Sequence, residues 1–241
     1  MLSACVETQD ISSRVVDRDR AVDDFVSLGM AYLQRGNRDA SRRNFEKALD
    51  LKPTAKQAHN GMGLLYQING ELALAESSFG RAIRSDSNYS QARVNYGAFM
   101  YQQQRYQEAY DQFKLASEDL SYEQRALALT YLGRAALQLG NLERAQSAFE
   151  HSLSIDRNQS LAQIELAEIN FDRKEYPLAK KYLDQYMSSE KSSARSLWLG
   201  IRLERIFGNK DKEASYVLAL KNLHPYSNEY LAYKNLLEQG G

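Results

Sequence analysis

The sequence has little cysteine, little proline and no net charge, and each shortage excludes a class of protein. A single cysteine rules out an internal disulfide, and with only three scattered histidines it disfavours a metal cluster. The 31 basic and 31 acidic residues balance, whereas a nucleic-acid-binding surface normally needs a basic excess. No apolar run is long enough to cross a membrane as a helix. With three prolines and much alanine, leucine, glutamate and arginine, the composition predicts a mostly helical chain.

One pattern of residues recurs at a fixed spacing. Gly29 and Gly63 are 34 residues apart, and so are Phe45 and Phe79. Glycine inside a helix costs about 1 kcal/mol relative to alanine, so we expect these glycines to allow a second helix to approach closely. The phenylalanines would then fill the space beside that contact. A period of this length with these residue types resembles the tetratricopeptide repeat, which has two antiparallel helices per unit.

The pattern continues with growing variation to the end of the chain. We place later copies of the glycine and phenylalanine positions at Gly97 and Phe113, Gly133 and Phe149, Ala167 and Leu183, and Gly200 and Leu218. Gly97 and Gly133 are 36 residues apart, and the two extra residues fall in the connection 117–122. The three prolines, Pro53, Pro177 and Pro225, all lie at expected helix boundaries.

The predicted fold is an all-α tetratricopeptide-repeat solenoid. We expect about six antiparallel helix pairs that form a right-handed superhelix, followed by a C-terminal capping helix. The expected repeats cover residues 22–55, 56–89, 90–125, 126–159, 160–192 and 193–226, with the cap at 227–241. Residues 21–241 would form this single solenoid, and residues 1–20 a lipobox remnant and a flexible polar tether.

The N-terminal residues indicate a lipid anchor. Residues 2–5 read Leu-Ser-Ala-Cys and fit the bacterial lipobox, in which a peptidase cuts before a cysteine that carries lipid. Because the match uses the only cysteine, we expect lipidation at Cys5, and a chance match is the alternative. The charged and apolar segments of a signal peptide are missing, so we expect the sequence to begin inside its own export signal. The residue after this cysteine is Val6 rather than aspartate. By resemblance to bacterial lipoproteins, this favours the outer membrane over the inner membrane.

The sequence contains no recognisable catalytic constellation. His59 stands where the repeat usually has a tryptophan, so we interpret it as a packing residue. His151 and His224 recur at no metal-ligand spacing, and no serine or cysteine has an activating base nearby in sequence. We therefore expect no enzyme, no metal, no cofactor and no small-molecule substrate.

The remaining candidate surface is a groove lined by the first helices of repeats one to three. Mostly apolar residues with interspersed amide and phenol groups occupy positions that do not pack into the spine, a composition suited to an extended or helical peptide. These partner-binding candidates are Val26, Met30, Leu33, Asn60, Leu64, Gln67, Val94, Ala98 and Tyr101. The alternative is that several of them only complete the core between adjacent helices.

Several segments are similar to one family beyond the generic repeat. They are Tyr32–Asn37, Asn95–Gly97, Arg105–Tyr110, Arg157–Gln159 and, closest of all, Ala194–Leu203. With them the chain resembles the type IV pilus biogenesis and stability lipoproteins, the pilotins of the pilus secretin. The resemblance implies six repeats, a lipid at Cys5, and a role in localising the secretin to the outer membrane and promoting its multimerisation.

These observations leave three hypotheses. The first is a non-enzymatic lipoprotein, lipid-anchored at the periplasmic face of the bacterial outer membrane, whose partner is the type IV pilus secretin subunit. The second is a general scaffold with an unrelated periplasmic or cytoplasmic protein partner. The third is an accessory domain of an enzyme. None of them includes nucleic acid as a partner.

Overall fold

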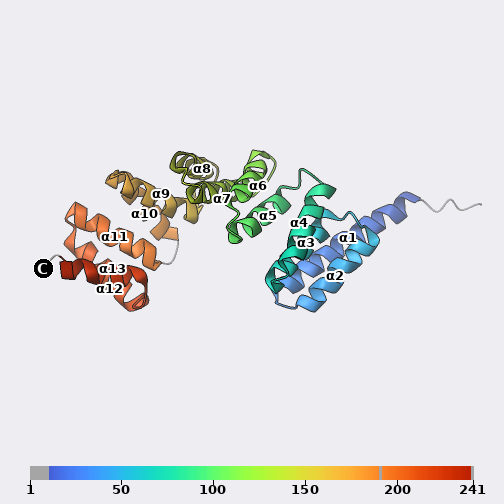
Figure 1. The fold of residues 1–241 in the computed structure, drawn as a ribbon, viewed down its shortest axis with the longest axis horizontal. Helices are drawn as coiled ribbons and strands as arrows, with labels where there is room; N and C mark the ends of the chain where they lie inside the picture. Colours follow the sequence, from blue (N-terminus) through green and yellow to red (C-terminus); the bar gives the residue numbers. More distant parts are fainter. Residues whose placement is uncertain (1–10, 190–191, 240–241) are drawn as a thin grey trace, which may run out of the picture. The chain divides into compact units, whose positions relative to one another are not determined.

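The computed structural model describes residues 11–189 and 192–239, and within these ranges every regular element is an α-helix. The helices are α1 (Ile11–Gln34), α2 (Arg38–Leu51), α3 (Lys56–Asn69), α4 (Leu72–Ser85), α5 (Ser90–Gln102), α6 (Tyr106–Glu118), α7 (Arg125–Gln138), α8 (Leu142–Ile155), α9 (Ser160–Asp172), α10 (Tyr176–Ser189), α11 (Ala194–Phe207), α12 (Lys210–Leu223) and α13 (Asn228–Gln239). Consecutive helices pack in pairs, α1 with α2 through α11 with α12 (Figure 1). The final helix, α13, packs against α11. The predicted all-α tetratricopeptide-repeat solenoid is confirmed.

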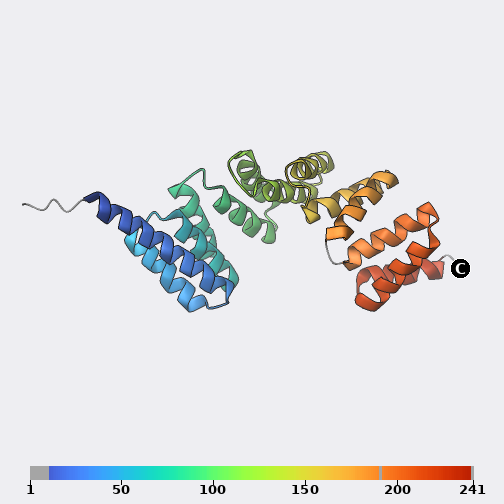
Figure 2. The same ribbon diagram turned by 180° about the vertical axis from the view of Figure 1, so that it is seen from behind.

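The contacts divide the chain into two compact units, which separate between Tyr122 and Glu123. The N-terminal unit contains α1 to α6, and the C-terminal unit contains α7 to α13 (Figure 2). The division falls in the connection 119–124, whereas the connections 52–55 and 86–89 are two residues shorter. The insertion that the sequence placed at 117–122 therefore lies in a loop between repeats.

Inside the pairs, an aromatic ring of the second helix lies on a glycine of the first. A Cβ atom on Gly29 would lie 2.5 Å from Phe45 Cε1, and a Cβ atom on Gly63 would lie 2.6 Å from Phe79 Cδ1. The same contact joins Gly97 to Phe113 and Gly133 to Phe149. All four phenylalanines are buried. The ring thus covers the glycine itself, rather than filling the space beside the contact as we expected.

One of these rings also joins two repeats. Phe45 contacts Gly29 of its own pair and, on α3, Gly61 of the next pair. A side chain at either glycine would overlap the ring, because the ring is completely buried. Phe45 therefore holds α1, α2 and α3 together.

The sixth repeat differs from our prediction in its aromatic position. A Cβ atom on Gly200 would lie 2.8 Å from Tyr216 Cδ2, whereas Leu218 is 59% exposed. The prediction of Leu218 was wrong, since it assumed a two-residue slip in this pair. Tyr216 follows Gly200 by 16 residues, the spacing that separates Gly29 from Phe45. In the fifth repeat, Ala167 and Leu183 are buried as predicted.

A left-handed residue ends the first helix of every pair. Glycine supplies it at Gly36, Gly70, Gly140 and Gly208, with φ between 71° and 77°. Gln104 and Lys174 take the same place in the third and fifth repeats, with φ of 60° and 64°. Positive φ is unfavourable for residues with a Cβ atom, so here the tertiary structure imposes the turn. Asparagine side chains then cap α2, α8 and α12.

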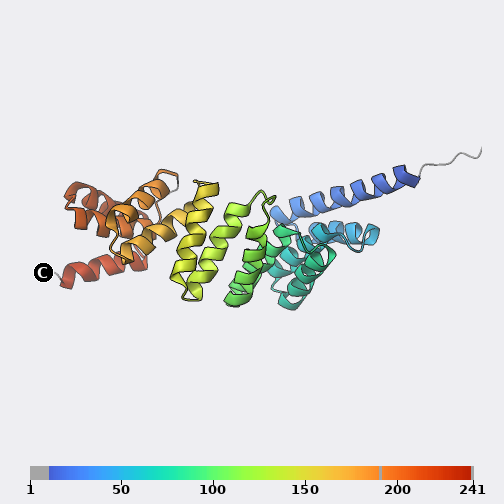
Figure 3. The ribbon, with the colours of Figure 1, turned by 90° about the horizontal axis from the view of Figure 1, so that it is seen from above.

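The first helix is longer than we predicted. We expected a flexible tether up to residue 20 and a helix from about residue 21, but α1 begins at Ile11. Figure 3 shows α1 extending past the end of α2. Residues 17–20 are exposed, and Asp19 accepts a hydrogen bond from Lys52 Nζ at 2.9 Å. The predicted lipidation residue, Cys5, lies outside the described residues.

Candidate functional site

The first helices of the N-terminal unit lie next to one another. Helix α3 contacts both α1 and α5, so residues at equivalent positions on these three helices form a continuous row. We call the nine predicted residues on this surface the first-helix row. Their degree of burial decides which of them a partner could reach.

The part of the row on α1 is apolar and half-buried. Val26 packs against the core cluster formed by Val22, Ala48, Ala55 and Ala58. Met30 and Leu33 pack against the cluster around Phe45. Each side chain therefore has one side held by the core and another side accessible to a partner.

The residues on α3 and α5 fall into two groups. Asn60 and Val94 are only 5% and 4% exposed, so they support the surface from below. Leu64, Gln67, Ala98 and Tyr101 are half-buried and complete the accessible part of the row. Tyr101 meets the ring of Tyr106 edge-on, with 5.2 Å between ring centroids.

Amide groups join α3 to α5 beneath and beside this row. Asn95 Nδ2 donates to Asn60 Oδ1 at 3.0 Å, which links α5 to α3. Gln67 Nε2 donates to Gln102 Oε1 at 2.7 Å and forms a second link between the same helices. Sequence reasoning named Asn60 and Gln67 as candidate ligand contacts, but in this structure both amides bond to the neighbouring helix.

A charged network that sequence reasoning missed supports the other side of α5. Tyr96 Oη donates to Glu76 Oε1 at 3.1 Å, and Arg105 Nη1 donates to the same oxygen at 2.8 Å. Burial of the phenol, together with the neighbouring Glu76 carboxylate, raises the pKa of Tyr96 to about 12. Arg105 also donates to Glu108. The network fixes α5 against α4 and α6.

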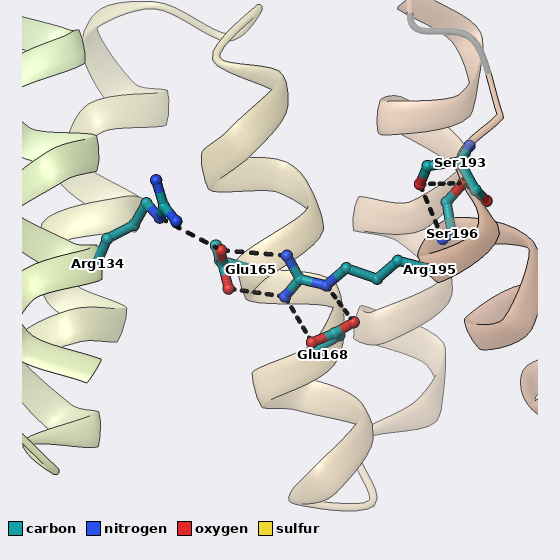
Figure 4. A network of polar contacts seen from close by, with 6 residues as sticks. All are labelled: Arg134, Glu165, Glu168, Ser193, Arg195 and Ser196. Carbon is teal, nitrogen blue, oxygen red and sulfur yellow. Dashed lines mark hydrogen bonds and ion pairs between the residues drawn. The ribbon is translucent and has the colours of Figure 1, made fainter. Parts of the chain in front are cut away.

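The first helices of the C-terminal unit carry a network of charged side chains (Figure 4). Arg195 of α11 donates from Nε and Nη2 to Glu168 at 2.6 Å. Its Nη1 and Nη2 also donate to Glu165, at 3.2 and 2.8 Å. Arg134 of α7 reaches Glu165 at 4.0 Å. These hydrogen bonds, above all those to Glu168, raise the pKa of Arg195. Our sequence reasoning considered only repeats one to three and missed this network.

His59 and His224 each contact a backbone carbonyl group. His59 is 7% exposed, and its Nε2 lies 2.8 Å from the carbonyl oxygen of Pro53. Burial lowers the pKa of His59 despite that hydrogen bond, so the neutral ring donates to the carbonyl. His224 caps α12, and its Nε2 lies 3.1 Å from the carbonyl oxygen of Ser192. Both rings join neighbouring segments of backbone.

The described residues contain no arrangement of side chains suited to holding a metal ion. In residues 11–189 and 192–239, no three His, Cys, Asp or Glu side chains are grouped for that purpose. Two shallow hollows of about 450 and 490 Å³ lie at the connections between repeats, and neither is lined by a residue of the first-helix row. Within the described part of the chain, no helix combines the length and apolar character needed to cross a bilayer.

Comparison with known proteins agrees with this architecture. A tetratricopeptide-repeat family matches residues 26–90 and 61–123, and a second such family matches residues 126–159. The type IV pilus assembly protein PilF of Pseudomonas aeruginosa is 37% identical over 235 residues, which cover 97% of this chain and 93% of PilF.

Two solved structures extend the comparison. A structure from the functional characterisation of P. aeruginosa PilF matches with a TM-score of 0.88 and 38% identity, over 91% of this chain and 99% of that one. PilW, described as a widely conserved type IV pilus biogenesis factor, matches with a TM-score of 0.75 over 88% of this chain and 97% of PilW. PilW is 24% identical, so it supports the fold alone. By its kinship with PilF, the chain belongs to the family of tetratricopeptide-repeat proteins of type IV pilus biogenesis.

Proposed function

We propose that this protein is a pilotin, a non-enzymatic lipoprotein that binds the secretin subunit of the type IV pilus. In this role it localises the subunit to the bacterial outer membrane and promotes its multimerisation. Kinship with a pilus assembly protein supports the pathway, and the resemblance of Ala194–Leu203 and the other family segments supports the role of pilotin. The binding surface is the first-helix row of the N-terminal unit.

The observation that carries this proposal is the half-buried apolar character of the row. Met30, Leu33 and Leu64 pack along α1 and α3 without being fully covered. Anchoring in the core fixes their positions, so little side-chain entropy is lost when a partner covers the rest of each side chain. An amphipathic helix or extended segment of the secretin subunit can bury its apolar side chains against such a row.

A lipid on Cys5 would supply the membrane anchor at the periplasmic face. The Leu-Ser-Ala-Cys pattern supports this part of the proposal. Each buried methylene contributes about 0.8 kcal/mol to membrane attachment. Holding several secretin subunits at one membrane raises their local concentration, which favours assembly of a ring without covalent chemistry.

The binding surface is tested with Leu64→Glu in the full chain. A carboxylate at this position should leave the fold intact, because Leu64 is only half-buried, and should weaken capture of purified secretin subunit by more than about tenfold, the change expected for losing a central apolar contact. The matched control is Leu74→Glu on α4, where the leucine is 48% exposed and lies outside the row. Affinity is measured by surface plasmon resonance, and folding by circular dichroism.

Two outcomes would contradict the proposal in different ways. Equal affinities for the Leu64→Glu and Leu74→Glu variants would show that the row is not the binding surface. Failure of the unmodified chain to capture secretin would reject this partner and favour an unrelated one.

The anchor is tested separately by labelling cells with an alkyne fatty acid. Cells that make the complete gene product should incorporate the label, and Cys5→Ser should abolish incorporation. Equal labelling of both proteins would show that the lipid is attached to another residue. No labelling of either protein would show that it carries no lipid anchor.

A further inference from the structure

A second surface lies between α9 and α11 in the C-terminal unit and includes no residue of the first-helix row. The guanidinium carbon of Arg202 lies 4.3 Å from the centroid of the Phe171 ring and 5.4 Å from that of Trp198. All three side chains are half-buried. Arg202 and Trp198 come from α11 and Phe171 comes from α9, so two successive repeats build this aromatic–arginine site.

The Nε atom of Arg202 is buried without a hydrogen-bond partner among the described residues. No described carboxylate forms an ion pair with the guanidinium group. Burial lowers the pKa of Arg202, although the more distant Glu168 and Asp172 carboxylates oppose this effect. Partial burial of a guanidinium group is unfavourable, and an anion bound at its accessible side would offset part of this cost.

Arg195, on the same face of the same helix, shows what such a group does when carboxylates are available. It lies seven residues before Arg202 and bonds to both Glu165 and Glu168 (Figure 4). Arg195 donates to both oxygens of Glu168, and Glu168 acts on Arg202 only from a greater distance. The helix therefore presents one arginine that is satisfied internally and one that is not.

We propose that Arg202, together with Phe171 and Trp198, binds an acidic side chain carried by an apolar segment of a protein partner. The planar guanidinium fork matches a carboxylate in a bidentate geometry. The two aromatic rings offer apolar surface for the residues next to that carboxylate. Arginine and tryptophan are also the residue types that contribute most to protein interfaces.

The surroundings favour a carboxylate over a phosphate group. Glu168 and Asp172 act on the Arg202 guanidinium from nearby, so an anion bound there is repelled in proportion to its charge. A carboxylate carries one negative charge, whereas a phosphate group carries nearly two at neutral pH. The glycine–aromatic spacing that recurs along this chain involves Gly200 and Tyr216, and it requires neither Trp198 nor Arg202.

The only tryptophan of the chain lies in this site, so its fluorescence reports binding directly. Random dodecapeptides displayed on phage are selected on the full chain, and the recovered peptides are synthesised and titrated while Trp198 emission is recorded. The same titrations are made with Arg202→Gln. The charge-matched control is Arg205→Gln on the same helix, where the arginine bonds to Glu213 at the surface.

We expect the selected peptides to carry Asp or Glu beside apolar residues and to shift Trp198 emission. Arg202→Gln should weaken their binding by more than about tenfold, as expected when one partner of a desolvated charge pair is removed, whereas Arg205→Gln should not. Replacing the acidic residue of the peptide by its amide should weaken binding to the unmodified chain but not to the Arg202→Gln variant. Circular dichroism confirms that both variants fold.

Three results would overturn the proposal. Recovery of no peptide that changes Trp198 emission would mean that the site does not bind a peptide. Equal loss of affinity in the Arg202→Gln and Arg205→Gln variants would show that peptide binding depends on the net charge of the protein and not on Arg202 itself. Displacement of the peptides by inorganic phosphate at lower concentration than by acetate would assign the site to phosphate. None of these results bears on the first-helix row, which is tested by Leu64→Glu.

Discussion

The ring of Phe79 covers Gly63 so closely that a methyl group at position 63 would lie 2.6 Å from Cδ1 of the ring. This separation is well below van der Waals contact, and the buried ring has no free space to move into. The contact fixes the distance between the two helices of the pair. Replacing a glycine by alanine should therefore destabilise the protein where a buried ring covers the glycine, and should not do so where no ring covers it.

Gly63→Ala should destabilise the protein, and Gly80→Ala should not. At position 63 the overlap with Phe79 costs about 1–3 kcal/mol, as is typical of overpacking. At position 80 the new methyl group meets only the flexible end of Arg84, and removing a glycine from a helix gains about 0.5–1 kcal/mol. Urea unfolding followed by circular dichroism measures both. Equal changes in the two variants would show that Gly63 does not lie at the helix contact.

Gln104→Gly should stabilise the third repeat. Gln104 holds φ at 60°, in the place where other repeats have glycine. Relief of the left-handed strain should raise the free energy of unfolding by about 0.5–1 kcal/mol, after allowing for the flexibility of glycine in the unfolded chain. Gly70→Gln, the reverse exchange at φ of 77°, should lower it by a similar amount. Changes of the same sign in both variants would contradict this account.

Arg195→Lys should weaken the contact between α9 and α11. Lysine keeps the charge but cannot donate to Glu165 and Glu168 at once in the geometry of the guanidinium fork. We expect a loss of about 1 kcal/mol, since the arginine is partly exposed. Arg205→Lys, which alters a surface pair with Glu213, should change the free energy of unfolding by less than about 0.5 kcal/mol. An equal loss of unfolding free energy in both variants would show that the Arg195 network stabilises the protein no more than an ordinary surface ion pair.

Tyr96 should make the stability of the protein depend on pH between 10 and 12. Its pKa is about 12 in the folded chain, against a usual value of 10.0. In this window the unfolded chain has lost the phenolic proton and the folded chain has kept it, so stability falls as pH rises. The difference in unfolding free energy between the wild-type chain and Tyr96→Phe should therefore narrow from pH 10 to pH 12. Tyr226→Phe, at a residue that is 99% exposed, is the control, and a difference that stays constant for Tyr96→Phe would reject the effect.

Local spacing was enough to predict the helix pairs. Glycine and phenylalanine 16 residues apart mark one pair because the contact between them lies within a single hairpin. The same spacing identifies Tyr216 as the partner of Gly200, and our prediction failed there because it looked for an aliphatic residue two positions later. The pattern was present, but tyrosine was not considered as a substitute for phenylalanine.

Other features leave no local pattern. The first turns of α1 were missed because apolar periodicity detects only a helix that buries one face, and residues 17–20 are exposed. The Arg195 network joins residues that are 27 and 30 positions apart. Their pairing depends on which faces of α9 and α11 meet, and composition cannot show this. For the same reason the sequence did not reveal that Asn60 and Val94 lie beneath the first-helix row.

Because the Phe45 ring serves Gly29 of one hairpin and Gly61 of the next, the two N-terminal hairpins share a single piece of core. A fragment that ends after α2 would leave one side of that ring in water, and a fragment that starts at α3 would lose the ring altogether. A fragment that keeps this piece of core must therefore contain α1, α2 and α3 together. Truncation studies of the protein should not separate these three helices.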